Sequence, residues 1–78
     1  MDQGRRVTLF DWVAIDRDKP NRAATLRAAD FVSAKREGLR RLGLSWNPER
    51  VRVHVVAQGE SPADALGRLR GAVAKEHR

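Results

Sequence analysis

Residues 7–15 read VTLFDWVAI, and this stretch decides how the rest of the chain can be arranged. It is rich in β-branched and aromatic residues, contains no Gly or Pro, and is too short for a typical helix, so it predicts a strand. The polar hexapeptide at residues 16–21 contains Pro20 and indicates a turn. Because the first strand is the most apolar segment of the chain, we expect it at the centre of a sheet.

Residues 22–44 allow two interpretations. In the first, a single helix spans the whole stretch and the chain becomes βαβα. In the second, Arg22–Ala29 forms a strand that pairs with the first one, and a helix runs from residue 31 to 42 between an Asp30 cap and a Gly43 stop. We favour the second, because a hairpin gives the first strand a hydrogen-bonding partner. The apolar stripe of this helix then comprises Phe31, Val32, Lys35, Leu39 and Leu42.

The clearest alternation lies in residues 51–58, where valines at 51, 53 and 55 alternate with Arg52, His54 and Val56. This period of two predicts a half-buried strand, which Gly59 ends. Ser61 and Pro62 are typical of a helix start. The apolar stripe of the last helix comprises Ala65, Leu66, Leu69, Ala72 and Val73.

These elements predict one small α+β domain over residues 1–78, in the order ββαβα. A right-handed crossover places the third strand beside the first, which makes a three-stranded antiparallel sheet of order 2-1-3. We expect both helices on one face of this sheet and the other face open. The alternative remains βαβα, and residues 1–5 and 75–78 are expected to be flexible.

Composition narrows the class of protein. The 78 residues include no cysteine and no apolar run long enough to cross a membrane, so we expect a cytoplasmic protein that does not bind membranes. The net charge is +6, from 16 Lys and Arg against 10 Asp and Glu, and residues 21–50 carry seven against three. This excess predicts a polyanion or an acidic protein surface as the partner.

No motif in the sequence points to catalysis. There is no phosphate-binding glycine loop, His54 has no Asp or Ser at a known local spacing, and His77 lies in the C-terminal tail. Asp16 and Asp18 open like a calcium loop, but Pro20 and Asn21 occupy positions that such a loop needs for a ligand and a glycine. We therefore expect no enzyme activity, no metal and no cofactor, and we interpret the aspartates as turn residues.

The candidate binding residues are basic and aromatic. On the first helix Arg36, Arg40 and Arg41 lie away from the apolar stripe, and Arg52 and His54 lie on the last strand. Phe10 and Trp12 share one face of the first strand. These two aromatics fit a core, a protein interface such as that of a homodimer, or a platform on which nucleic-acid bases stack.

Residues 29–59 read ADFVSAKREGLRRLGLSWNPERVRVHVVAQG, a capped helix followed by a short loop and an alternating strand. This pattern resembles the Jag N-terminal domain, a small βαβ unit of proteins that also carry RNA-binding modules. The overall shape is similar to small phage and mobile-element proteins, including anti-CRISPR proteins. The leading hypothesis is a non-enzymatic module that binds nucleic acid or a ribonucleoprotein through the Arg-rich helix and the sheet edge. The alternative is a phage or mobile-element protein that binds and inhibits a host protein.

Overall fold

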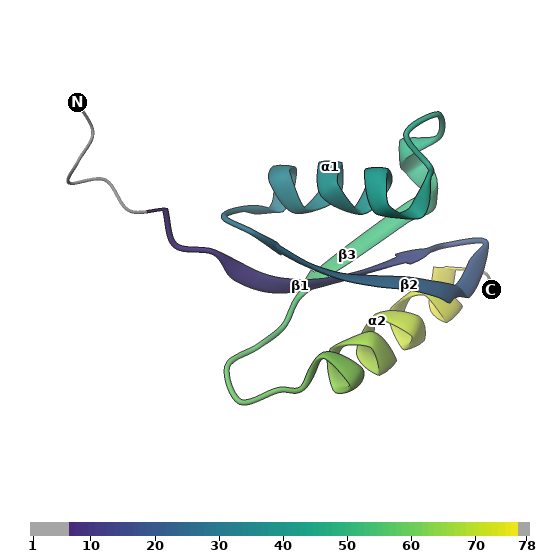
Figure 1. Cartoon of the computed structure of the whole chain (residues 1–78). Coiled ribbons are helices and arrows are strands. Elements are labelled where there is room, and N and C mark those ends of the chain that lie inside the picture. The colour runs from purple at the N-terminus through teal and green to yellow at the C-terminus, as the bar shows by residue number, and fades with distance from the viewer. Residues whose placement is uncertain (1–6, 77–78) are drawn as a thin grey trace, which may run out of the picture.

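A computed structural model describes residues 7–76 and shows the predicted order ββαβα (Figure 1). The three strands form an antiparallel sheet of order β2-β1-β3, which confirms the central position of the first strand. The strands are β1 (Phe10–Asp16), β2 (Lys19–Ala28) and β3 (Val51–Val55). The helices are α1 (Phe31–Leu42) and α2 (Pro62–Glu76), and a 3-10 turn, η1 (Pro48–Arg50), precedes β3.

The hairpin of β1 and β2 shows that the interpretation of residues 22–44 as one helix is wrong. β2 pairs with β1 from Phe10↔Ala28 to Ile15↔Ala23. Its alanine-rich sequence forms strands poorly by itself, because alanine has little side chain to pack on a sheet. The pairing with β1 supplies the missing stabilisation, and the indole Nε1 of Trp12 donates a hydrogen bond to the carbonyl of Ala28 at 3.0 Å.

The two helices cover opposite faces of the sheet, so the prediction of both helices on one face is wrong (Figure 1). Trp12 and Ala14 of β1 pack in the core beneath α1, whereas Val13 and Ile15 pack in the core beneath α2. All four side chains are buried. A central strand that is apolar on both sides has to be covered on both sides, which the expectation of an open face overlooked.

Helix α1 approaches the sheet through two small residues and only part of the predicted stripe. Its buried residues are Ala34, Gly38 and Leu42, and Leu39 packs against the core, while Phe31 and Val32 of the stripe are exposed. A Cβ atom placed on Gly38 would lie 3.1 Å from the Cβ of Ala14, so the glycine permits this close approach. The ends of the helix are as predicted, with Asp30 accepting from the N–H of Ser33 and Gly43 in the left-handed conformation at φ 69°.

Helix α2 buries Ala65, Leu69 and Val73 of the predicted stripe, whereas Leu66 is partly buried and Ala72 is exposed. Its start is also as predicted, since the hydroxyl of Ser61 accepts a hydrogen bond from the N–H of Asp64. The helix continues through residues 75 and 76, where we expected flexibility. The same expectation for residues 1–5 and 77–78 lies outside the described residues. Neither helix within residues 7–76 has the length and apolar character needed to cross a membrane.

Candidate functional site

The topology gathers both helix C-termini at one end of the molecule. β2 and β3 run in one direction, and β1, α1 and α2 run in the other (Figure 1). The guanidinium of Arg22 on β2 accordingly donates to the carbonyl of Leu42 at the end of α1, at 2.6 Å. On the other side of the sheet, Arg52 of β3 forms an ion pair with Glu76 at the end of α2, at 2.8 Å.

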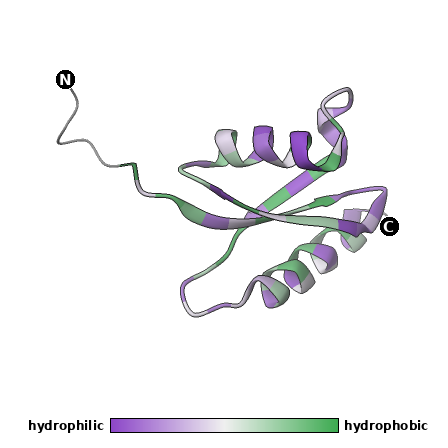
Figure 2. Ribbon diagram, in the orientation of Figure 1, coloured by the Kyte–Doolittle hydropathy of each residue, from purple (hydrophilic) through white to green (hydrophobic). Residues whose placement is uncertain are grey.

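This end carries the whole net charge of residues 7–76. When each helix and strand is divided at its midpoint, the end holds nine Lys and Arg against five Asp and Glu, and the opposite end holds four against four. Figure 2 shows hydrophilic residues in the β1–β2 turn and in the later turns of α1. We call the nine cations the basic end: Arg17, Lys19, Arg22, Arg40, Arg41, Arg50, Arg52, Arg70 and Lys75.

Helix electrostatics explains part of this distribution. The C-terminus of a helix carries a partial negative charge, so cations in the last turn stabilise it by a few tenths of a kcal/mol to about 1 kcal/mol each. Arg40 and Arg41 lie in the last turn of α1, and Lys75 lies in the last turn of α2. Since both helices end on the same side, their separate preferences for cations add up to one positively charged surface.

A buried carboxylate organises the centre of the basic end. Asp16, at the end of β1, is completely buried and accepts two hydrogen bonds from Arg50, at 3.2 and 2.6 Å. Burial by itself would raise the pKa of Asp16, but the hydrogen bonds from Arg50 and from the N–H of Asp18, together with the charge of Arg50, lower it. Arg22 lies 3.7 Å from the same carboxylate. The aspartates of this segment are therefore turn and ion-pair residues, as the sequence indicated for the turn.

Trp46 is a feature of the basic end that the sequence analysis did not select. It lies in the loop between α1 and η1 and is 70% exposed. The guanidinium of Arg50 lies over the indole, 5.5 Å from the ring centre. The signal in the sequence was a tryptophan in a loop, two residues before Pro48. In a loop, a large apolar side chain has few neighbours to pack against.

The structure distributes the predicted basic residues over two faces. Arg40 and Arg41 lie on α1, where both bind the carboxylate of Glu37. Arg36 lies on the exposed side of the same helix, and its side chain forms no hydrogen bond or ion pair with another of the described residues. Arg52 points to the face covered by α2 and also reaches the backbone at the outer edge of β3.

His54 lies toward the opposite end of the molecule, on the face covered by α2. Its Nδ1 is 3.2 Å from the guanidinium of Arg68. Burial, and to a lesser degree the charge of Arg68, lower the pKa of His54. The ring is therefore neutral at pH 7 and adds no positive charge to the surface.

The two predicted aromatics have different environments. Trp12 is 8% exposed and belongs to the core beneath α1, so its interpretation as an interface residue is wrong. Its ring makes an edge-on contact with Phe31, at 6.3 Å between centres. Phe10 is half exposed at the start of β1. Helix α1 covers the face of the sheet that carries Trp12. That face is therefore not open as a platform for stacked bases or as a dimer interface.

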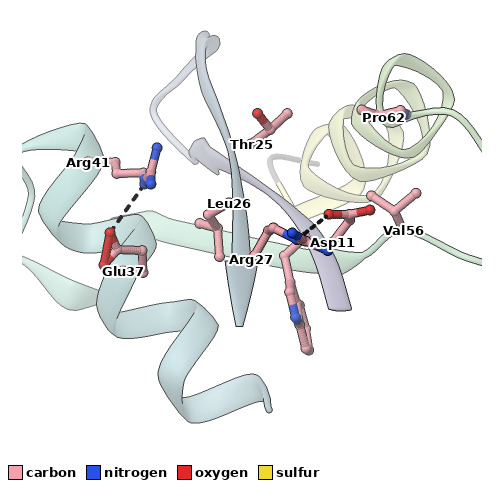
Figure 3. Close-up of a pocket in the computed structure, with 9 residues that line it drawn as sticks. Asp11, Thr25, Leu26, Arg27, Glu37, Arg41, Val56 and Pro62 are labelled. Atoms are coloured by element: carbon pink, nitrogen blue, oxygen red, sulfur yellow. Dashed lines mark hydrogen bonds and ion pairs between the residues drawn. The ribbon is translucent and has the colours of Figure 1, made fainter. Parts of the chain in front are cut away.

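A hollow of about 460 Å³ runs alongside β2 (Figure 3). Its charged residues are paired with one another: Arg41 with Glu37, and Arg27 with Asp11. The hollow therefore has balanced charge and lacks the excess of cations seen at the basic end. Within residues 7–76, no three His, Cys, Asp or Glu side chains gather closely enough to hold a metal ion.

Comparison of the chain with protein-family models, with curated proteins and with solved structures finds no match. The similarity of residues 29–59 to the Jag N-terminal domain, and of the overall shape to anti-CRISPR proteins, therefore stays a prediction.

Proposed function

We propose that this chain is a non-enzymatic module that binds nucleic acid, with the basic end as its interface. The observation that carries the proposal is the location of the net charge: within residues 7–76, all of it lies at one end, and arginine supplies seven of the nine cations there. The planar guanidinium donates paired hydrogen bonds that match a phosphate group better than the ammonium of lysine does.

Several of these arginines are able to exchange their present partners for phosphate. Arg40 is 76% exposed, and its ion pair with Glu37 lies at the surface. Surface ion pairs contribute at most about 1 kcal/mol, so exchanging one for a phosphate contact costs little. Arg50 differs, because its partner Asp16 is buried and holds it in place. The interface thus combines exposed arginines that reach the ligand with one arginine that is held rigidly.

The test is the salt dependence of binding to a fluorescently labelled oligonucleotide, measured by anisotropy. Each phosphate contact releases counterions, so the logarithm of the affinity should fall by about 0.7 to 0.9 per contact for each tenfold rise in salt. Arg40→Ala and Arg41→Ala should each reduce this slope by about one contact. Arg68→Ala, at the opposite end and paired with Glu60, is the matched control and should leave the slope unchanged.

Two results would contradict this assignment. If binding depends on salt but none of the basic-end variants changes the slope, the interface lies elsewhere on the molecule. If the chain binds no nucleic acid at physiological salt, the proposed class of partner is wrong.

A second candidate function is the binding and inhibition of a host protein. The observation in its favour is an exposed apolar surface at the end opposite the basic end, where Phe10, Phe31 and Val55 surround the edge of the buried Trp12. Exposed apolar groups gathered at one place are typical of protein interfaces. In this case Phe31→Ser should abolish complex formation, whereas Arg40→Ala should mainly slow association.

A further inference from the structure

We infer that Trp46 is a stacking site for an unpaired base, so that the ligand at the basic end is single-stranded nucleic acid. This inference rests on the proposed function and goes further by naming the class of nucleic acid. The first observation is the exposure of the residue: Trp46 is 70% exposed, in a chain that buries its other tryptophan almost completely. Burying an aromatic ring of this size is strongly favourable, so a ligand that covers it gains affinity.

The second observation is that the ring is held in place rather than free to collapse onto the surface. On one side of it in the chain, Leu44 is buried, and its carbonyl accepts a hydrogen bond from the N–H of Asn47 at 2.9 Å. On the other side, the N–H of Arg50 donates to the carbonyl of Asn47 at 3.1 Å. The backbone that carries Trp46 is thus attached at both ends.

The third observation is the guanidinium that covers one face of the ring. Arg50 lies 5.5 Å from the centre of the indole, and it is fixed in turn by two hydrogen bonds to the buried carboxylate of Asp16. Trp46 is nevertheless 70% exposed, which leaves ring surface away from Arg50 in contact with solvent. A base on that surface would complete a stack of guanidinium, indole and base without any rearrangement of the protein.

The surroundings select a nucleic acid over an uncharged aromatic ligand. Arg22 shares the carboxylate of Asp16 with Arg50, and it also binds the carbonyl of Leu42 at the end of α1, where Arg40 and Arg41 lie. A base on Trp46 would therefore have cations nearby for its own phosphate and the neighbouring ones. In a duplex each base is already stacked on its neighbours, so this contact requires an unpaired strand.

The experiment compares a single-stranded oligothymidylate with a duplex of the same length, over the same series of salt concentrations, for the wild type, Trp46→Phe and Trp46→Ala. We expect Trp46→Ala to weaken single-strand binding by about tenfold and Trp46→Phe by less than about threefold, since phenylalanine keeps a ring face. The slope of affinity against salt should stay the same in both variants, because the phosphate contacts remain. Phe31→Ala removes an exposed aromatic at the other end and serves as the control, with unchanged binding expected.

A spectroscopic measurement reports on the ring directly. In the variant Trp12→Phe, Trp46 is the remaining tryptophan of the chain, and its emission should be quenched as the single strand binds. Binding that is salt-dependent but unaffected by Trp46→Ala, or equal for duplex and single strand, would overturn the inference and leave the proposed function standing. If the chain binds neither nucleic acid, both the proposed function and the inference about Trp46 are wrong. If only a protein partner quenches the emission, Trp46 belongs to a protein interface.

Discussion

The substitution Gly38→Ala tests the close packing of α1 on the sheet. In an exposed helix, replacing Gly by Ala stabilises by roughly 1 kcal/mol, because glycine loses more backbone entropy on folding. At Gly38 the added methyl would lie 3.1 Å from the Cβ of Ala14, 3.3 Å from a Cγ of Val53 and 3.4 Å from a Cγ of Val51. Carbon atoms pack best at about 3.5 to 4.0 Å, so the contacts with Ala14 and Val53 are too short, whereas that with Val51 is an ordinary contact.

The neighbours of Gly38 have little freedom to move. Ala14 belongs to the central strand, which is hydrogen-bonded on both sides, and its methyl has no alternative rotamer. Val53 is β-branched and therefore stiff. The helix would have to move away from the sheet and loosen the contacts of Ala34 and Leu42. Overpacking of this kind costs about 1–3 kcal/mol, which exceeds the gain in helix propensity. We expect a net loss of up to about 2 kcal/mol.

Urea unfolding followed by circular dichroism measures this loss, and the other helix provides matched controls. Gly67 and Gly71 of α2 have open space where a Cβ would be, so Gly67→Ala and Gly71→Ala should each stabilise by about 0.5 to 1 kcal/mol. In a double-mutant cycle, Gly38→Ala and Ala14→Gly should show favourable coupling, because the second change removes the methyl that the first one meets. If Gly38→Ala raises the free energy of unfolding as the α2 variants do, the close-packing argument is refuted.

The remaining predictions concern charged groups. Asp16→Asn removes the partner of the poorly exposed Arg50 and should cost roughly 3 kcal/mol in the free energy of unfolding, whereas Asp64→Asn at the exposed start of α2 should cost well under 1 kcal/mol. The pKa of Asp16 is lower in the folded state than its ordinary value, so its contribution to stability is present at neutral pH and is lost as the pH falls through the folded pKa. Acid unfolding monitored by circular dichroism should therefore begin at higher pH in Asp16→Asn. The folded pKa of His54 is also lowered, which for a base means that stability is complete above its ordinary pKa of about 6.5 and declines below it. A plot of the free energy of unfolding between pH 5 and 8 should lose this decline in His54→Gln, and a decline that persists would assign it to another group.

Local sequence signals were sufficient for the two helices and their caps, whereas the ends of the strands differ from the predicted ones by up to three residues. The Asp30 cap, the Gly43 stop and the Ser61 cap lie where they were predicted, because each depends on hydrogen bonds within one turn of the chain. The alternation in β3 was also sufficient, because the period of two reflects a strand with one face buried. The order of the sheet followed from the apolar character of β1.

Contacts between distant residues decided the rest. Alanine-rich β2 became a strand because β1 needed a partner, and α1 turned Gly38 rather than Phe31 toward the core because only a residue without a side chain fits against Ala14. The candidate site likewise has one part that the sequence indicated and one part that only the folded structure shows. Arg40, Arg41 and Arg52 were predicted as binding residues from charge alone, and that assignment stays a prediction. The cluster of Asp16, Arg50 and Trp46 was not predicted. Asp16 and Arg50 are more than thirty positions apart in the sequence, and only the folded topology brings them together at one end of the molecule.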